Sequence, residues 1–449
     1  MGDQRLGSWC RWLSIALLTA ACSPAARPPD VVIVVLDTTR ADRLGVYGHT
    51  RPVSPNLDAF ARDSVVYDRA WSVASWTLPS HASLLTGQYP TAHGARITPF
   101  TDDTSNGDNP AHLREEATTL AELLLERGYQ TAAFAGAGWL APEFGLLQGY
   151  EVQDAVNNRT IPAEQISDRA IRWVESVPRE QPIHLLVNYF DPHFPHDPKP
   201  PYDRYARGKP HIRIPELGEI LGGAPPTPEQ FSKMLDLYDG EIEYMDHHLG
   251  RLFAALRETG RYDDALIVVI ADHGELFGEH GHSGHGAWLW EELVRIPLIV
   301  HYPAGRDAGE RVDAVVSTVD VLSWVGAELE MPLPPDVHGL PVGQRTLVLA
   351  QEFPNGLFVK LGGDEMDRNL TAGVEWPWKL IESSRGQRLL FRLDADPGET
   401  DALDEDDAET RIRSAVEAVQ SKISIPSPSG PRPMSPEARE HLRELGYIE

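Results

Sequence analysis

Cysteine is almost absent from this chain of 449 residues. The two cysteines, Cys10 and Cys22, both lie at the N-terminal end. Once a signal segment ending before Cys22 is removed, a single cysteine remains, so no disulfide can form within the mature monomer. The fold must therefore be stabilised by its core, and a hydrophobic content of 41% is sufficient for one.

Positive charge is also scarce. The chain has 40 Lys and Arg against 67 Asp and Glu, which gives a formal net charge of −27. This balance argues against nucleic acid as a partner, because phosphate backbones are bound by basic surfaces. It does not exclude a small anionic substrate, because a bound metal ion can dominate the local potential.

Long apolar runs are missing except near the N-terminus. There Arg5 and Arg11 precede a short apolar run, 12–18, and the small residues 19–21 lie directly before Cys22. This run is too short for a confident membrane span. It resembles a bacterial lipoprotein signal with lipid attached at Cys22; the alternative is an ordinary cleaved signal in which Cys22 is incidental. We expect export and anchoring to a bacterial membrane through lipidated Cys22.

Apolar strand-like segments alternate with helical ones along the rest of the chain. The expected strands are 31–36, 130–135, 184–189, 265–270 and 296–301, and the expected helices are 118–127, 163–176, 228–258 and 318–329. Such alternation predicts an α/β fold with a parallel sheet between two layers of helices. The expected regions are 1–22 (signal), 23–30 (tether), 31–345 (catalytic domain), 346–425 (C-terminal subdomain) and 426–449 (arm and short helix).

Residues that can bind a metal follow two of the apolar strands. Asp37 ends the first strand, and Asp272 and His273 end a later one. In parallel sheets such strand ends meet at one edge, where ligands bind. Thr77 begins a helical run, so its hydroxyl lies where backbone N–H groups favour an anion. Together these features indicate a metal-activated nucleophile for phosphoryl or sulfuryl transfer.

These residues belong to a longer series of motifs in which the chain resembles the sulfatase family of the alkaline phosphatase superfamily. The series comprises 54–58 (SPNLD), 84–90 (LLTGQYP), 191–195 (DPHFP), 291–299 (EELVRIPLI) and 393–400 (LDADPGET). The resemblance covers nearly all of the chain after residue 30. It implies an ester hydrolase with an alkaline phosphatase-like fold: a mixed, mostly parallel sheet sandwiched by helices, and a small C-terminal α+β subdomain.

The chain departs from sulfatases at the catalytic motif. Sulfatases convert a Cys or Ser to formylglycine, whereas this alignment places Thr77 at that position and His81 at the position of the following Arg. A formylglycine is therefore excluded. A family Lys expected after the strand 130–135 is also missing, because Gly136–Gly138 follows instead. Threonine nucleophiles occur in relatives that act on phosphoesters, so the substrate is an ester of sulfate or phosphate.

The set Asp37, Thr77, Asp272 and His273 resembles the single-metal site of phosphoethanolamine transferases. A histidine nitrogen suits zinc or manganese better than calcium, although calcium remains an alternative. By resemblance, His193 contacts the oxygens of the transferring group.

Three further histidines leave alternatives open. His285 is a candidate general acid or substrate clamp. His81 either binds a substrate oxygen or fixes the rotamer of the nucleophile. A second metal site built from Asp191, His193 and His285 is a further alternative, whereas Asp246-His247-His248 is interpreted as structural because adjacent helical residues point in different directions.

The sequence thus predicts an exported, metal-dependent hydrolase or transferase that acts on an anionic ester of a glycan, a lipid or a small molecule. The alternatives are a phosphotransferase similar to phosphoethanolamine transferases and an inactive relative that only binds anions.

Overall fold

The structure is a computed structural model that describes residues 27–96, 112–155, 161–207, 226–425 and 435–444. The expected signal segment, with Cys10 and Cys22, lies outside the described residues. No helix within the described ranges is both long and apolar enough to cross a membrane.

An eight-stranded sheet forms the centre of the molecule. Its order is β10-β2-β9-β6-β1-β5-β3-β4. These strands are β1 (Val31–Leu36), β2 (Val65–Trp71), β3 (Gln130–Ala135), β4 (Val152–Ala155), β5 (Ile183–Tyr189), β6 (Leu266–Ile270), β9 (Leu298–His301) and β10 (Arg311–Ser317). Only β9 is antiparallel to its neighbours, so the sheet is mixed and mostly parallel. The central strand β1 is fully buried, because both of its faces are covered.

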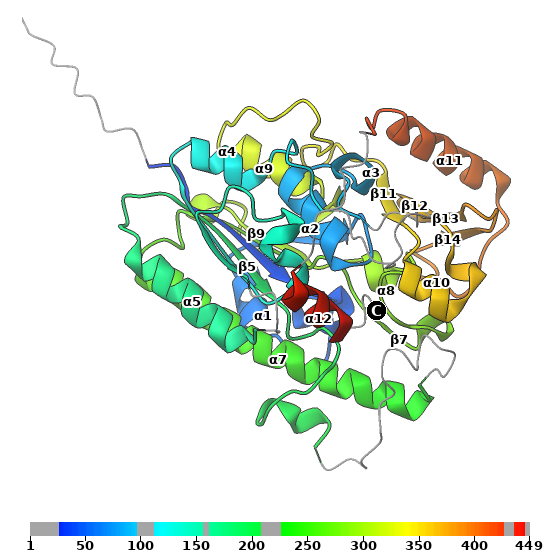
Figure 1. Ribbon diagram of the computed structural model, residues 1–449, viewed down its shortest axis with the longest axis horizontal. Coiled ribbons are helices and arrows are strands. Elements are labelled where there is room, and N and C mark those ends of the chain that lie inside the picture. The colour runs from blue at the N-terminus through cyan, green and yellow to red at the C-terminus, as the bar shows by residue number, and fades with distance from the viewer. Residues whose placement is uncertain (1–26, 97–111, 156–160, 208–225, 426–434, 445–449) are drawn as a thin grey trace, which may run out of the picture.

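Helices cover both faces of this sheet (Figure 1). One layer contains α1 (Pro55–Arg62), α5 (Ala163–Ser176) and the long α7 (Pro228–Glu258), and the other contains α2 (Thr77–Thr86), α4 (Leu120–Glu126) and α9 (Asp320–Glu328). The short α3 (Pro90–His93) follows α2, and α8 (Glu291–Val294) precedes β9. The predicted fold class is confirmed.

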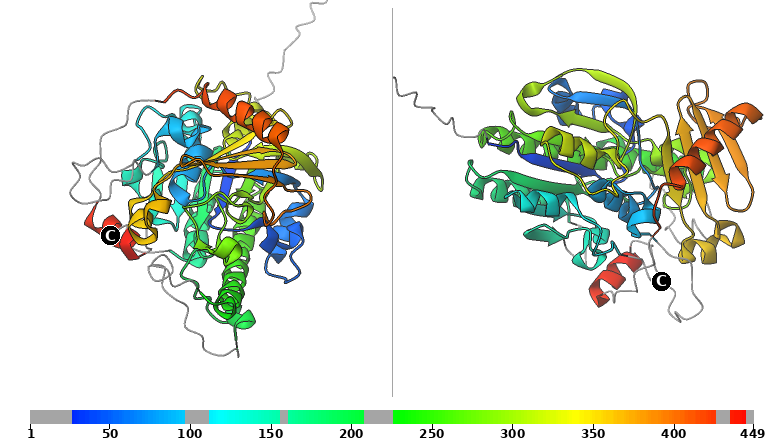
Figure 2. Two further views of the ribbon diagram at one scale, coloured as in Figure 1. Left: turned by 90° about the vertical axis from the view of Figure 1, so that its right-hand side faces the viewer. Right: turned by 90° about the horizontal axis from the view of Figure 1, so that it is seen from above.

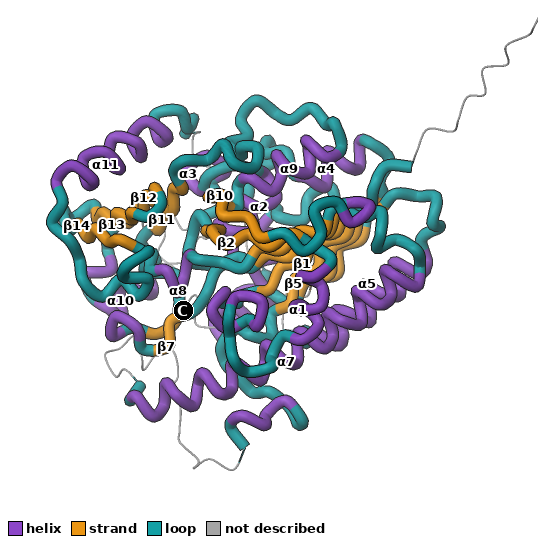
Figure 3. The backbone as a smooth tube through the Cα atoms, turned by 180° about the vertical axis from the view of Figure 1, so that it is seen from behind, coloured by secondary structure: helices purple, strands orange, loops and turns teal. Residues whose placement is uncertain are grey.

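A second, antiparallel sheet lies beside the first, as Figure 3 shows from behind. Its strands are β11 (Val348–Glu352), β12 (Leu370–Glu375), β13 (Trp378–Ser383) and β14 (Arg388–Arg392), and α11 (Asp406–Gln420) packs against it. The remaining elements are the hairpin β7 (Leu276–Phe277) and β8 (Ser283–Gly284), α10 (Gly356–Gly362) and α12 (Pro436–Glu444). Figure 2 shows α11 on the small sheet and α12 well apart from it.

Within the central sheet, the strands that the sequence pattern does not reveal are β2, β4 and β10. β4 and β10 are the edges of the sheet, where one side of a strand is open to solvent and polar residues are tolerated. β2 carries the half-buried Asp68 and Arg69 in its middle, so its apolar run is interrupted.

A buried ion triad joins the two sheets. Lys379 on β13 is fully buried, and its Nζ lies 2.9 Å from Oε1 of Glu291 on α8 and 2.9 Å from Oε1 of Glu399. Burial raises the pKa of Glu399 to about 7, even though the Lys379 charge opposes this shift. The ammonium group is thus the partner that allows both carboxylates to be buried.

We predict that Lys379→Met destabilises the protein by about 3–5 kcal/mol, because it leaves two carboxylates facing each other without their cation. Urea unfolding at pH 8 measures this change. The control is Arg411→Gln, which removes the solvent-exposed pair with Glu375 and should cost less than about 1 kcal/mol. Equal unfolding midpoints for the two variants would contradict the role given to Lys379.

Candidate functional site

The carboxyl ends of β1 and β6 meet the N-terminus of α2. Asp37 follows β1, Asp272 and His273 follow β6, and Thr77 is the first residue of α2. All four side chains are buried. Helix α2 begins here because Trp76 is extended, while Pro79 lies within the first turn, where its missing N–H costs nothing.

Thr77 faces an imidazole nitrogen that can accept a proton or bind a metal. Its Oγ1 lies 3.4 Å from Nε2 of His273. Nδ1 of the same ring is 2.8 Å from the carbonyl oxygen of Gly274, to which it donates, so Nε2 carries the lone pair. Burial also lowers the pKa of His273 well below its usual value, which keeps the ring neutral.

The two carboxylates have oxygens without partners. Oδ1 of Asp272 accepts from the backbone N–H groups of Thr38 (3.1 Å) and His273 (2.8 Å), whereas Asp272 Oδ2 and Asp37 Oδ1 are buried and accept no hydrogen bond. Burial raises the pKa of Asp37 and of Asp272, and the charge of Asp272 raises that of Asp37 further. Unpartnered carboxylate oxygens of this kind fit a bound divalent cation, which would satisfy them.

His81 lies within this group, one turn along α2. Its Nδ1 donates to the carbonyl oxygen of Thr77 at 3.0 Å and lies 3.4 Å from Asp272 Oδ2. Asp37, His81 and Asp272 together present ligand atoms close enough to share one metal ion. Burial lowers the pKa of His81 to about 4, so near neutral pH it offers a neutral ring and not a charged clamp for substrate oxygens.

Asn188 is a site residue that the sequence reasoning missed. Its Oδ1 accepts from the N–H of Ala137 at 3.1 Å, which fixes the amide. Nδ2 then donates to Asp37 Oδ2 at 3.1 Å and faces Nε2 of His81 at 3.4 Å. The available signal was the single amide side chain of the buried strand β5, whose sequence also includes His184 and Tyr189.

Two further histidines extend the site from His273. The rings of His273 and His285 are 4.5 Å apart, and those of His285 and His193 are 4.9 Å apart. Nδ1 of His285 lies 3.1 Å from Oε1 of Glu275, a residue not singled out from the sequence. Burial alone would lower the pKa of His285, but the charge and hydrogen bond of Glu275 raise it, which suits a proton donor.

Asp191 lies elsewhere, although it also follows a strand. Its Oδ1 accepts from the N–H of Ala163, the first residue of α5, at 3.0 Å. Among the described residues, it shares no metal-capable group with His193 and His285. The structure therefore does not assemble the second metal site that the sequence left as an alternative.

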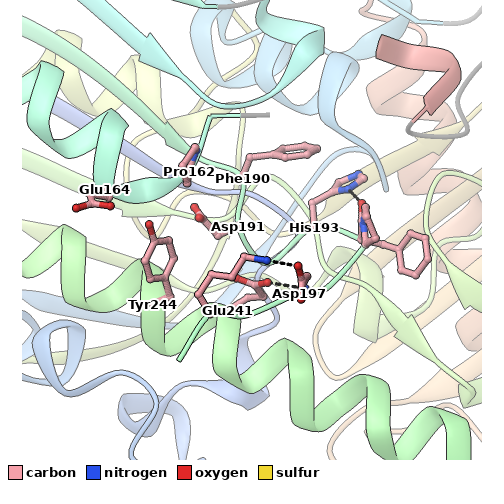
Figure 4. Close-up of a pocket in the computed structure, with 11 residues that line it drawn as sticks. Pro162, Glu164, Phe190, Asp191, His193, Asp197, Glu241 and Tyr244 are labelled. Atoms are coloured by element: carbon pink, nitrogen blue, oxygen red, sulfur yellow. Dashed lines mark hydrogen bonds and ion pairs between the residues drawn. The ribbon is translucent and has the colours of Figure 1, made fainter. Parts of the chain in front are cut away.

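Asp191 lines a cavity of about 510 Å³ next to His193 (Figure 4). Glu241 from α7 faces it there, and Glu241 Oε1 accepts from the backbone N–H of Asp197 at 2.8 Å. Burial raises the pKa of Asp191 to about 7, and burial together with the Asp191 charge raises that of Glu241 to about 8. The cavity thus adds an acidic recess to one side of the site.

We predict that Glu241→Gln flattens the dependence of stability on pH. The carboxyl of Glu241 holds its proton in the folded state up to about pH 8 but releases it near pH 4.5 when unfolded. Its contribution to stability is therefore present below pH 4.5 and is lost as the pH rises to 8. Thermal unfolding should show equal midpoints for variant and wild type at pH 4.5 and a more stable variant at pH 8. Parallel pH profiles would contradict this.

The whole chain is similar to proteins named as sulfatases and as alkaline phosphatase superfamily members. It is 23% identical over 458 residues to the uncharacterized sulfatase YidJ of Escherichia coli, covering 89% of this chain and 88% of that one. It is 27% identical to PehA of Trinickia caryophylli, a multifunctional alkaline phosphatase superfamily protein, covering 84% and 92%.

Solved structures share the fold. The phosphonate monoester hydrolase of Agrobacterium radiobacter superposes with a TM-score of 0.71 at 20% identity, covering 88% of this chain and 96% of that chain. A protein solved in complex with its substrate D-glucosamine-2-N,6-O-disulfate superposes with a TM-score of 0.72 at 18% identity, covering 89% and 99%. The Sulfatase family model matches residues 29–326, well over half of the sequence. Together with the alkaline phosphatase-like sheet, this match shows that the chain belongs to the sulfatase family of ester hydrolases.

Proposed function

We propose that this protein is an exported, metal-dependent hydrolase of phosphate or sulfate esters in which Thr77 is the nucleophile. The observation that carries the proposal is the position of the Thr77 hydroxyl. It lies at the N-terminus of α2, 3.4 Å from His273 Nε2, and beside two buried carboxylates that have unpartnered oxygens. The backbone N–H groups at the start of a helix also favour binding of an anionic phosphate or sulfate group.

Asp37 and Asp272 would hold the metal ion together with imidazole nitrogens. His273 Nε2 carries a lone pair and lies 3.4 Å from Asp272 Oδ2, and His81 offers Nε2, because its Nδ1 donates to the carbonyl of Thr77. A mixed oxygen and nitrogen donor set favours zinc or manganese over calcium. When bound, such an ion lowers the pKa of a neighbouring hydroxyl and offsets charge on the transferring group.

The side chains of the site then have distinct roles. Thr77 Oγ1, having released its proton to solvent, attacks the phosphorus or sulfur atom in line as an alkoxide, and the bond to the leaving oxygen breaks. His285, kept protonated by Glu275, donates a proton to that oxygen. In the second half, neutral His285 accepts a proton from the water that hydrolyses the threonyl ester, which restores both residues.

Phosphate esters are the favoured substrate class. Neutral His81 occupies the position at which sulfatases have an arginine, and Gly136–Gly138 provides no lysine. Parallel assays with aryl sulfates, phosphomonoesters, phosphodiesters and phosphonate monoesters test this preference, and addition of an acceptor alcohol would reveal a transferase.

We predict that Thr77→Ala lowers turnover by about 10⁴-fold or more, because it removes the nucleophile. Thr77→Ser should keep measurable activity, because it keeps the hydroxyl. The control is Thr86→Ala, at the other end of α2, where the hydroxyl donates to the carbonyl of Ala82 and accepts from the N–H of Gln88. Steady-state kinetics on the best ester of the panel measure all three variants. Near-wild-type turnover by Thr77→Ala would refute the mechanism.

We predict that the purified protein contains zinc or manganese, since the donor set includes imidazole nitrogen. Elemental analysis should show this metal, and dialysis against a chelator should abolish turnover until the metal is restored. His273→Asn should lower the metal content, whereas His247→Asn, on the exposed face of α7, should not. Calcium alone, bound equally by His273→Asn, would contradict the prediction.

We also predict that the mature protein begins at a lipidated Cys22, because small residues and an apolar run precede it. Mass spectrometry of membrane-extracted protein should find a diacylated or triacylated Cys22. Cys22→Ser should release the protein from the membrane, whereas Cys10→Ser should not. A mature protein that begins elsewhere and carries no lipid would contradict this.

A further inference from the structure

We propose that the C-terminal helix α12 supports the active site, and that His441 on it is a positioning residue for Asn188, the amide that donates to Asp37. This inference rests on the proposed function of the same site. It extends the site beyond the part of the chain that the family model matches, residues 29–326. Figure 1 shows α12 lying across the catalytic domain, far from α11, the helix that precedes it.

Helix α12 is docked by buried side chains. Leu442 is completely buried and belongs to the main hydrophobic core, and His441 is only 3% exposed. Oγ of Ser435, the residue before the helix, donates to Oε1 of Glu143 at 2.8 Å. A nine-residue helix that only rests on a surface would not bury two consecutive side chains, which point in different directions, so completely.

Gly138 provides the space for the His441 ring. A Cβ at this position would lie 2.6 Å from Cδ2 and 3.3 Å from Nε2 of His441, which is closer than van der Waals contact. Any residue larger than glycine would therefore push the imidazole away from the backbone of residues 138–140. The close approach indicates that the position of this ring is specified by the fold.

The same backbone segment leads directly into the catalytic group. Ala137, next to Gly138, donates its N–H to Oδ1 of Asn188, and Asn188 in turn donates to Asp37. The position of α12 is thus linked through residues 137–138 to the amide that orients a candidate metal ligand.

His441 also lies within electrostatic reach of His193, where a positive charge on it would lower the pKa of His193. His193 stacks on Phe190 with ring centroids 4.2 Å apart, and its other side faces His285. Phe190 and His285 thus flank the ring of His193. The geometry ties His441 to Asn188, through its close approach to Gly138 and the hydrogen bond that Ala137 donates to Asn188. Loss of His441 should therefore weaken productive ester binding more than it weakens the fold.

The test compares His441→Ala, His441→Gln and Glu440→Gln in the full-length, metal-loaded enzyme. Glu440 lies next to His441 but on the exposed face of α12, where it pairs with Arg443. We expect His441→Ala to lower kcat/KM roughly tenfold or more, as misplacement of the groups that hold an active site does. His441→Gln, which keeps a polar side chain, should recover part of this loss, and Glu440→Gln should leave kcat/KM unchanged. Thermal unfolding midpoints ensure that all assays use folded protein.

A double-mutant cycle separates positioning from simple loss of a side chain. Gly138→Ala should lower kcat/KM in the wild-type background, because its Cβ displaces the His441 ring. In the His441→Ala background the same change should have little further effect, since the ring is gone. Additive losses, or a His441→Ala enzyme within threefold of wild type, would overturn the proposal. Thr77→Ala is assayed in parallel. If Thr77→Ala stays active, the proposed function fails. If Thr77→Ala is inactive but His441→Ala is fully active, only the role of His441 is refuted.

Discussion

The proposed catalytic centre depends on two carboxylates buried side by side. Asp37 and Asp272 lie at the carboxyl ends of adjacent strands, and each has an oxygen that accepts no hydrogen bond. Two buried negative charges repel each other and are costly to remove from water, as their raised pKa values indicate. An arrangement of this kind is stable when fixed donors, protons or a cation compensate it, and the surrounding residues are organised around that need.

Three groups donate hydrogen bonds to the two carboxylates. Backbone N–H groups of Thr38 and His273 serve Asp272, and the amide of Asn188 serves Asp37. The histidines His81 and His273 are held neutral by burial, so they contribute lone pairs and not charges to the same space. His285 differs because Glu275 keeps its pKa high. The neutral rings of His81 and His273 and the protonated ring of His285 therefore lie in one region, with the ring centroids of His273 and His285 4.5 Å apart.

The small antiparallel sheet is connected to this centre by buried contacts through α8. Glu291 on α8 binds both Lys379 of the small sheet and the indole Nε1 of Trp71. The carbonyl of Leu293, on the same helix, accepts from the N–H of Gly274, directly after His273. The buried ammonium group of Lys379 is therefore linked, through one short helix, to the backbone that carries a candidate metal ligand.

Much of the fold and part of the site followed from local sequence. Apolar runs such as 31–36 and 266–270 could only be buried strands, and a carboxylate directly after each had to lie at the same sheet edge, which is how Asp37, Asp272 and His273 could be predicted. The start of a helix at Thr77 was equally local, since it depends on Pro79 and the residues around it.

The positions of Asn188, Glu275 and His441 were not local. Nothing in a single amide or a C-terminal histidine indicates which strands or loops it will face, because that depends on the order of strands and the path of the chain. Asp191 shows that a similar local sequence does not guarantee the same position. Like Asp37 it follows an apolar strand, yet tertiary packing turns its carboxylate to the first turn of α5 and into a separate cavity. Sequence determined which residues could carry the chemistry, and only the tertiary structure decided which of them meet, because contacts between distant segments arise from packing and not from neighbouring residues.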